Sequence, residues 1–321
     1  MTRARGLVLA VLGAGLAALV LAWVFLGSAT VTKETSFTIP AGASVASVAE
    51  KLEAEGLISS AAGFVLQARV FGSDAPIQAG EFLLKPGMSQ SAILAAFQSG
   101  DVIRRFVTIP EGMPSILVWE RLMAEDLLTG EIDVPPEGSI LPDTYAFERG
   151  QPRAELVAQM QAAMDRALAE EWAKRSPRIA VDTMRDALIL ASIVEKETGK
   201  PEERRMVAGL YSNRVRTGMK LQADPTIIYP ITKGKPLGRR IRQSEIAAVN
   251  GYNTYTRVGL PEGPITNPGR ESIAAVMNPE NTAALFMVAD GTGGHWFAST
   301  LAEHNANVAK WYAIRRERGE M

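Results

Sequence analysis

The stretch "ILASIVEKETGK", residues 189–200, runs from an apolar segment into two glutamates one residue apart and then into a glycine. Apolar residues recur at helical spacing from Met184 onward, and Gly199 followed by Pro201 is a usual helix stop. Asp182 is the expected N-cap of this helix. Because a helix that is apolar around most of its surface lies inside a domain, the stretch predicts the centre of a helix-rich folded unit.

The two acids of this helix, Glu195 and Glu197, differ in position. Residues two apart on a helix point about 200° away from each other, so the two carboxylates cannot act together on one bond. Glu197 lies in the last turn, where the helix dipole and partial burial both raise the pKa of a carboxyl group. A raised pKa suits a general acid near neutral pH. A structural role in an ion pair with Arg204 or Arg214 is equally compatible with Glu197, and a structural role is favoured for Glu195.

The composition narrows the classes of function. The chain has 321 residues, 47% of them hydrophobic, which is enough for two folded units of roughly 100 to 200 residues each. Its net charge is −1 without a block of Lys or Arg, which argues against a nucleic-acid partner. The sequence has no cysteine and only two histidines, His295 and His304, so we expect no disulfide, no metal site and no cofactor. Serine-hydrolase, Walker and Rossmann motifs do not occur.

The first 30 residues predict a membrane anchor. Leu7 to Leu26 is an uncharged apolar run of 20 residues, about the length that crosses a bilayer as a helix. A cleaved signal peptide is the disfavoured alternative, because its apolar region is shorter, roughly 7 to 15 residues. Arg3 and Arg5 precede the run, so the N-terminus is expected in the cytoplasm and everything after about residue 30 outside it.

Two segments of the chain repeat each other. "TIPAGASVASVAEKLEAEGLI" (38–58) and "TIPEGMPSILVWERLMAEDLL" (108–128) are identical at 10 of 21 aligned positions, and a shorter echo covers residues 85–100. Each copy predicts a short strand, a Pro-Gly turn and an amphipathic helix. Such units resemble LysM-like modules, which bind N-acetylated glycans. A spacer that holds the rest of the protein away from the membrane is equally compatible with the pattern.

The remaining sequence predicts a second, helix-rich domain that follows the Pro- and Gly-rich run at 133–147. Helices are expected over about 156–172, from Asp182, and over 202–216; a β-hairpin with the turn "GTGG" and a last helix opened by a capping box at Thr300 and Glu303 follow. The predicted fold class is therefore α+β. It comprises a transmembrane helix within 1–30, a LysM-like strand/helix module at 31–132, and a helix-rich α+β domain with a C-terminal hairpin and helix at 133–321.

Two polar clusters favour a sugar-binding site. They are "NRVRTGMKLQADPTIIY" (213–229) and "YNTYTRVGLPEGPITNPG" (252–269), which combine amides, tyrosines and rigid turns. Amide and hydroxyl groups beside flat aromatic rings suit a sugar, since each sugar has apolar faces and many hydroxyls. Taken singly, each cluster is equally compatible with an ordinary loop.

Five motifs in order carry a family resemblance: "LPDTYAF", "ASIVEKETG", the two polar clusters, and "GGHWFASTLAEHN". Together they resemble the MltG-type (YceG-like) endolytic murein transglycosylases of bacteria. The resemblance implies a single-pass enzyme of the cytoplasmic membrane whose catalytic domain is periplasmic or extracytoplasmic. Such an enzyme cleaves the MurNAc–GlcNAc bond of nascent peptidoglycan strands, leaves 1,6-anhydromuramoyl ends and limits strand length. The resemblance also implies peptidoglycan synthases as partners.

The resemblance implies roles for individual residues. Glu197, which precedes Thr198 in "KET", matches the family's catalytic acid, and Glu195 becomes a supporting residue that pairs with an arginine. The family commonly has proline where this chain has Glu262, which bears on the stiffness of that loop. The residues that match the polar motifs are expected to bind the glycan: Gln222, Asp224, Thr226, Asn253, Thr254 and Tyr255.

Two other functions stay open at this point. The first is a hydrolytic muramidase in which a second carboxylate, such as Asp224, positions water. The second is a glycan-binding scaffold without catalysis that recruits cell-wall synthases. Product ends separate a transglycosylase from a muramidase, and a scaffold would not need Glu197.

Overall fold

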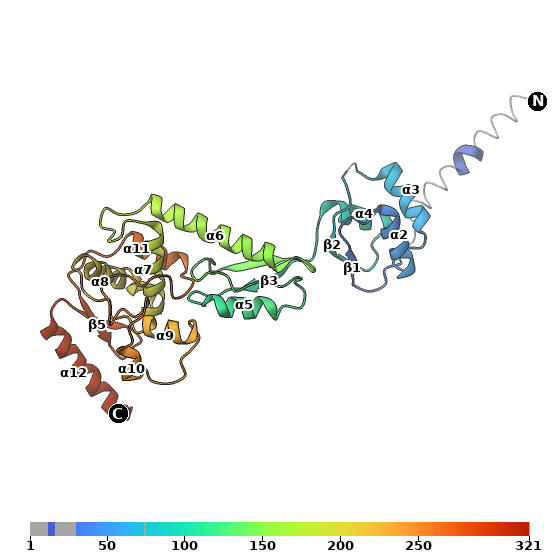
Figure 1. Cartoon of the computed structure of the whole chain (residues 1–321). Helices are drawn as coiled ribbons and strands as arrows, with labels where there is room; N and C mark the ends of the chain where they lie inside the picture. The colour runs from blue at the N-terminus through green and yellow to red at the C-terminus, as the bar shows by residue number, and fades with distance from the viewer. Residues whose placement is uncertain (1–11, 17–29, 74, 321) are drawn as a thin grey trace, which may run out of the picture. The chain divides into compact units, whose positions relative to one another are not determined.

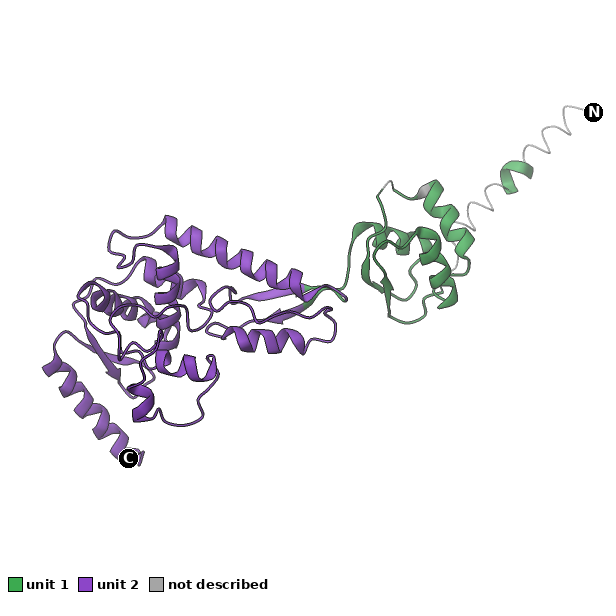
Figure 2. Ribbon diagram, in the orientation of Figure 1, with its two compact units in different colours: residues 1–105, 147–149 green, residues 106–146, 150–321 purple. Residues whose placement is uncertain are grey.

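The computed structural model describes residues 12–16, 30–73 and 75–320. Two compact units divide the chain (Figure 1, Figure 2): unit 1 is Met1–Arg105 with Phe147–Arg149, and unit 2 is Phe106–Ala146 with Gly150–Met321. The predicted anchor at 7–26 lies mostly outside the described residues. Within those ranges, no helix is both long and apolar enough to cross a membrane.

From residue 30 onward, the described part of unit 1 combines one antiparallel pair of strands with three helices. Phe37 lies opposite Phe82 in the sheet, and the rings of Phe37 and Phe82 lie 5.7 and 4.8 Å from that of Phe97. All three rings are fully buried, so the aromatic cluster holds the sheet to the helices. The elements in chain order are β1 (Thr35–Ile39), α2 (Val45–Ala54), α3 (Ala61–Phe71), β2 (Gly80–Leu84) and α4 (Gln90–Ser99).

Unit 2 is rich in helices and has its strands in two small pairs, β3–β4 and β5–β6. Figure 1 shows the long helix α6 along one side and the C-terminal helix α12 at the far end of this unit. The elements from residue 105 onward are β3 (Arg105–Thr108), α5 (Ser115–Met123), β4 (Thr144–Phe147), α6 (Arg153–Ala173), α7 (Met184–Glu197), the 3-10 turn η1 (Pro201–Glu203), α8 (Arg204–Arg216), α9 (Pro225–Thr232), α10 (Gln243–Ile246), α11 (Arg270–Met277), β5 (Phe286–Ala289), β6 (His295–Ala298) and α12 (Leu301–Glu317).

These elements confirm the α+β class and most of the predicted helices. The predicted β-hairpin and the capping box of Thr300 and Glu303 are confirmed as well. The predicted N-cap of α7 is wrong by one residue. Thr183, not Asp182, caps the helix, and its hydroxyl accepts a hydrogen bond of 3.0 Å from the backbone N–H of Asp186. Both residue types cap helices well, so the sequence alone could not separate these neighbours.

The two units divide at residues 105 and 106, earlier than the Pro-rich run at 133–147 suggests. The second copy of the repeat explains the difference. Its strand β3 pairs with β4, and the backbone N–H of Ile109 donates to the carbonyl of Asp143 over 2.9 Å. The turn after this strand is held by Gly112, whose N–H donates to the carbonyl of Asn267 over 3.0 Å. The two repeated segments therefore belong to different units, which sequence similarity between them could not reveal.

Helix α7 lies at the centre of unit 2. Seven of its residues are buried, including the unbroken run from Ile189 to Val194, and it packs against α6, α8, α9 and α11. A helix enclosed in this way has its two ends fixed by its neighbours. Glu197 is its last residue, so packing of the apolar run determines where that carboxylate lies.

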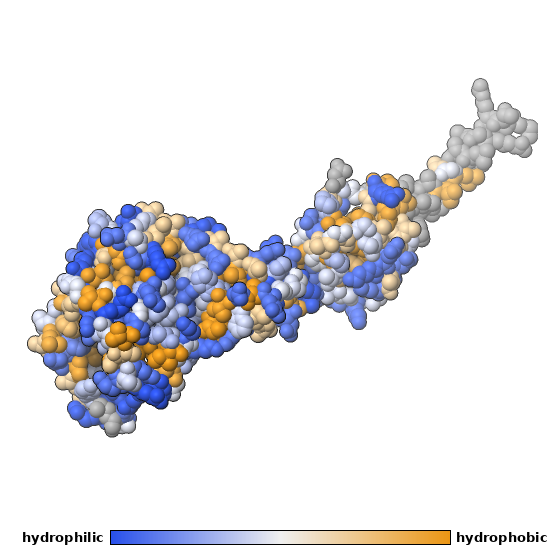
Figure 3. Space-filling view, in the orientation of Figure 1, coloured by the Kyte–Doolittle hydropathy of each residue, from blue (hydrophilic) through white to orange (hydrophobic). Residues whose placement is uncertain are grey.

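The connection from α9 to α11, residues 233–269, is mostly exposed up to residue 250 and mostly buried from 261 onward. Its two most exposed apolar side chains are Val249 (88% exposed) and Val258 (56%). On the face of this unit seen in Figure 3, apolar and polar side chains are interspersed. Between these two valines the chain turns inward at Asn253 and Thr254, which are fully buried, so the connection is anchored in the middle.

Candidate active site

Glu197 lies where three elements of unit 2 meet. It ends α7, and its carboxylate accepts a hydrogen bond from the hydroxyl of Tyr211 on α8. Arg214, one turn further along α8, and Asp224, the N-cap of α9, are close enough for their charges to act on it. The side chain keeps a partly exposed surface, although protein atoms surround the carboxylate on most sides. This combination is typical of an acid that meets a substrate from a largely desolvated position.

Burial raises the pKa of Glu197 from its ordinary value of 4.5 to about 7. The hydrogen bond from Tyr211 lowers this pKa, the negative charge of Asp224 raises it, and the positive charge of Arg214 lowers it. Desolvation dominates because it penalises the charged form directly. A carboxyl group with a pKa near 7 holds its proton about half of the time at neutral pH, so it can serve both as acid and as base. The direction of this shift is the one that the position of Glu197 predicts from the sequence, with burial as its largest cause.

Tyr211 is a buried donor to Glu197. Burial raises its own pKa well above 10, and the neighbouring charge of Glu197 adds to the rise, so the phenol remains neutral and keeps its proton. Helix α8, which carries Tyr211, packs closely against the backbone of Glu280 at Gly209, where a β-carbon would lie 2.6 Å from the carbonyl oxygen of Glu280. Only glycine allows this approach, which fixes α8, and with it Tyr211, at this depth.

Arg214 is a cation that backbone carbonyls hold in place. Its Nε donates to the carbonyl of Leu285 over 2.7 Å and its Nη1 to that of Leu221 over 2.6 Å. The guanidinium lies 5.6 Å from the centre of the Phe286 ring, a cation–π distance. Because arginine keeps its charge in proteins, Arg214 is a fixed positive charge that favours the ionised form of Glu197.

Three of the predicted glycan-binding residues, Gln222, Asp224 and Tyr255, are exposed or partly exposed, and the charges of Glu197, Asp224 and Tyr255 act on one another. The hydroxyl of Tyr255 donates to Asp224 Oδ1 over 2.5 Å. Gln222 has a left-handed backbone with φ of 50°, and its N–H donates to the carbonyl of Thr254 over 3.2 Å. We call Asp224 and Tyr255, together with the exposed Gln222 two residues before Asp224, the rim.

The other three, Thr226, Asn253 and Thr254, are fully buried. The hydroxyls of Thr226 and Thr254 bond to each other over 2.8 Å, and Asn253 Nδ2 donates to the carbonyls of Glu245, Ile246 and Ala248. These side chains therefore join the loop at 250–256 to α9 and α10. From the interior of the unit they hold Asp224 and Tyr255 in position, and they are not part of the rim themselves.

Glu195 lies on the other side of α7, as helical geometry requires. Its Oε2 accepts a hydrogen bond of 3.0 Å from the backbone N–H of Gly269, and its side chain packs beside Gly112. The expected arginine partner of Glu195 is thus replaced by a backbone amide. Arg204, a candidate partner of Glu197, pairs with Glu111 instead. Glu195 supports the packing of two loops against α7.

The loop with Glu262, where the family commonly has proline, is held by its backbone. The N–H of Glu262 donates to the carbonyl of Gly251 over 3.0 Å, and its own carbonyl accepts from Arg185 Nη2 over 3.1 Å. Proline could not donate the first of these bonds. Hydrogen bonds therefore restrain the backbone of this loop, as the ring of a second proline would.

Comparison with known proteins places this geometry in a family. The sequence profile of the YceG-like family matches residues 37–310. The chain belongs to the YceG-like family. This family assignment agrees with the resemblance drawn from the five motifs, and the match extends over both compact units.

Relatives of this YceG-like chain include bacterial proteins whose names state an activity. A Bacillus subtilis (strain 168) protein named endolytic murein transglycosylase is 26% identical over 315 residues, which cover 88% of this chain and 86% of the relative. A Streptococcus pneumoniae (serotype 2, strain D39) protein of the same name is 28% identical over 87% of this chain and 58% of its own length. The crystal structure of a YceG-like protein of Listeria monocytogenes shares the fold, with a TM-score of 0.53, 26% identity, and coverage of 85% of this chain and 98% of that one.

The raised pKa of Glu197 predicts a pH-dependent effect of Glu197→Gln on stability. The folded state binds the proton more tightly than the unfolded state does, so the wild-type free energy of unfolding falls as the pH rises from 4.5 through about 7. Glutamine does not titrate. The variant should therefore gain about 1–3 kcal/mol relative to wild type between pH 5 and pH 8, measured by urea unfolding. A difference that stays the same at both pH values would contradict the raised pKa.

Proposed function

We propose that this YceG-like protein is an endolytic lytic transglycosylase that cleaves the MurNAc–GlcNAc bond of peptidoglycan strands and leaves 1,6-anhydromuramoyl ends. The observation that carries the proposal is one partly exposed carboxyl group, Glu197, with a pKa near 7 beside a fixed donor and a fixed cation. The names of the Bacillus and Streptococcus relatives support the same reaction and substrate.

One carboxyl group suffices for this reaction. Protonated Glu197 gives its proton to the oxygen of the glycosidic bond as that bond breaks, and the resulting carboxylate takes the proton from the C6 hydroxyl of the muramoyl sugar. The C6 oxygen then bonds to C1, which closes the anhydro ring, and Glu197 is protonated again. Glycosidases that use water generally need two carboxylates. Here the substrate's own hydroxyl takes the place of water.

The neighbours of Glu197 have roles in this cycle. Tyr211 donates to the carboxylate and Arg214 offsets its charge, so both favour the ionised form that appears after the first proton transfer. The exposed groups of Gln222, Asp224 and Tyr255 are proposed to bind the glycan along the rim, with the Tyr255 ring against a sugar face. Glu195 is proposed to act indirectly, through the loops that it holds against α7.

The anchor remains part of the proposed function. The uncharged run from Leu7 to Leu26, preceded by Arg3 and Arg5, supports a single membrane pass with the N-terminus in the cytoplasm. We therefore propose that the catalytic unit lies outside the cytoplasmic membrane, near nascent strands and the synthases that make them.

The orientation predicts a protease result. In cells whose outer layers are permeabilised while the cytoplasmic membrane stays intact, added protease should degrade the chain beyond residue 30, because that part lies outside the membrane. A cytoplasmic protein in the same sample is the control. Full protection of the chain until the membrane is dissolved would contradict the orientation.

Unit 1 is proposed to bind glycan as a LysM-like module. The order β1, α2, α3, β2 with antiparallel strands supports this, as does a groove between the start of α2, the helix α3 and the segment that follows it. The groove combines apolar side chains with polar ones, which suits an N-acetylated sugar. Residues that line it include Ser44, Val65, Arg69, Pro76 and Gln98.

A titration tests this module. N-acetylglucosamine tetramer added to the chain from residue 30 onward should shift the amide NMR signals of Ser44 and Gln98, because these residues line the groove. The signals of Glu50 and Glu53, which lie in a different groove between α2 and α3, serve as the control. If no signal in the first groove moves at millimolar sugar, unit 1 is a spacer.

Product analysis tests the reaction itself. The chain from residue 30 onward, incubated with uncrosslinked peptidoglycan strands, should yield anhydromuramoyl ends detected by mass spectrometry. Glu197→Gln should lower their rate of formation by about 100-fold or more, since it removes the general acid. Glu195→Gln should lower it by about 3- to 10-fold, since it loosens the loops around α7.

The alternatives predict other products. Reducing ends in place of anhydro ends would indicate a muramidase, with Asp224 as the second carboxylate. Full activity in Glu197→Gln would contradict the assignment of the acid. No cleavage by the wild-type chain, together with tight binding of the strands, would favour the scaffold.

A further inference from the structure

The connection between α7 and α8 is held by side-chain contacts. Glu197 ends its helix, so no later helical turn fixes it, and Thr198 continues with an extended backbone. The Thr198 hydroxyl accepts from the N–H of Lys200 over 3.1 Å and lies 3.4 Å from Glu203 Oε2, to which it donates. This connection sets the spacing between Glu197 on α7 and Tyr211 on α8.

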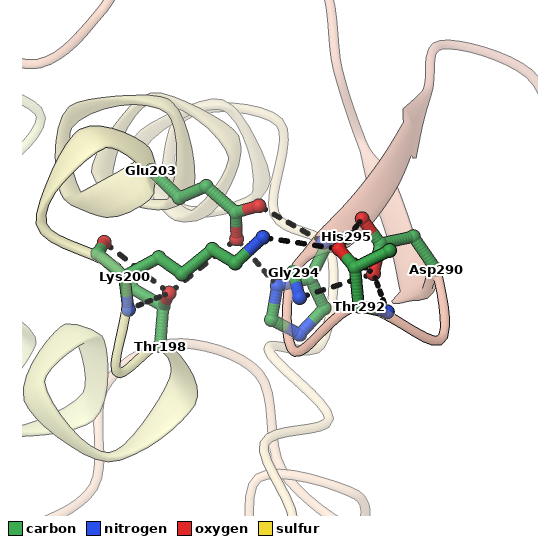
Figure 4. A network of polar contacts seen from close by, with 7 residues as sticks. All are labelled: Thr198, Lys200, Glu203, Asp290, Thr292, Gly294 and His295. Carbon is green, nitrogen blue, oxygen red and sulfur yellow. Dashed lines mark hydrogen bonds and ion pairs between the residues drawn. The ribbon is translucent and has the colours of Figure 1, made fainter.

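The turn of the β5–β6 hairpin contacts this connection through hydrogen bonds (Figure 4). Glu203 Oε1 accepts from the backbone N–H of His295 over 3.0 Å, and Glu203 Oε2 lies 2.8 Å from His295 Nδ1. A carboxylate offers only acceptors, so Nδ1 carries the hydrogen. Lys200 Nζ donates to the Thr292 hydroxyl over 3.1 Å. Both ends of the connection are therefore tied to the hairpin.

The turn is built for this contact. Asp290 Oδ1 accepts from the N–H groups of Thr292 and Gly294, over 2.7 and 3.1 Å, and so shapes the turn. At Gly294 a β-carbon would lie 2.3 Å from a Glu203 oxygen and 2.8 Å from Lys200 Nζ. A larger residue would require the ends of the Glu203 and Lys200 side chains to shift from these positions. Glycine at this position therefore leaves room for both side chains to reach the turn.

The base of the same hairpin holds the cation of the site. The residue before β5, Leu285, gives its carbonyl to Arg214 Nε over 2.7 Å, and Phe286 lies under the guanidinium. The hairpin thus contacts the surroundings of Glu197 at two points: the chain just after the acid, and the charge beside it.

We propose that the β5–β6 hairpin is a clamp that positions the general acid, with His295 and Glu203 as its positioning residues. The inference rests on the proposed role of Glu197. It gives a task to the motif "GGHWFASTLAEHN", for which the reaction itself needs no residue. Neither His295 nor Glu203 exchanges a proton with the substrate. Their pair holds the end of α7 so that Glu197 meets both Tyr211 and the scissile bond in the productive geometry.

Steady-state kinetics of anhydromuramoyl product formation test the clamp. His295→Ala should lower kcat by about 10- to 100-fold and leave KM within about twofold, because misplacement of a reacting group by about 1 Å costs this much while binding is unaffected. His295→Asn should recover most of the lost kcat, since the amide Nδ2 can donate from nearly the same place as Nδ1. Glu170→Gln, which removes an exposed ion pair with Arg270 in the same unit, is the matched control and should leave both constants unchanged.

A second measurement separates positioning from general stability. The amides of residues 195–200 should exchange their hydrogens faster in His295→Ala than in wild type, compared under conditions in which both proteins have the same free energy of unfolding. In Glu170→Gln these amides should exchange at the wild-type rate. If His295→Ala does not fold, Thr198→Val, which removes only the hydroxyl that reaches Glu203, carries the same test with a smaller loss of kcat.

The outcomes for the clamp and for the acid are distinct. Wild-type kcat in the folded His295→Ala or Thr198→Val variant, together with an inactive Glu197→Gln variant, would overturn the clamp and leave the proposed function in place. An active Glu197→Gln variant would instead overturn the proposed function. A change in KM alone would show that the hairpin binds substrate, which also contradicts the clamp.

Discussion

The burial of helix α7 is the constraint on which the rest of unit 2 depends. Seven of its residues are enclosed by α6, α8, α9 and α11, and its last residue is a glutamate. Burying a carboxylate is costly unless it is neutralised, hydrogen-bonded or paired. The protein uses all three: a proton held by a raised pKa, the Tyr211 hydroxyl, and the nearby charge of Arg214. The position of the acid and its chemistry thus have one physical origin.

The sequence could predict those features of the site that depend on a single helix, and not those that depend on contacts between elements far apart in the chain. That Glu195 and Glu197 cannot act as a pair followed from the period of one helix, since residues two apart face opposite ways. The last-turn position of Glu197 and the Thr198 that follows it then favoured Glu197. The role of Tyr211 did not, because it depends on how α8 packs against α7 at Gly209. Arg214 could be named only as one of two candidate partners, and its partners at Leu221 and Leu285 are carbonyls brought near by the fold.

The polar motifs show the same limit. Threonine and asparagine in a loop are equally suited to bind a ligand or to satisfy backbone groups, and the sequence does not reveal which side faces inward. In the structure, Thr226, Asn253 and Thr254 are buried and support the rim, while Gln222, Asp224 and Tyr255 form it. The unit boundary at 105–106 also escaped the sequence, because the second repeated segment packs with later residues rather than with its own copy.

Burial brings the pKa of Glu197 close to neutrality. Selective 13C labelling of glutamate side chains, with the Glu197 signal assigned by its loss in Glu197→Gln, allows this pKa to be read directly from an NMR titration. A midpoint of about 7 is predicted. A midpoint near the ordinary value of 4.5 would contradict the claim, because the carboxyl group would then carry no proton to give at neutral pH.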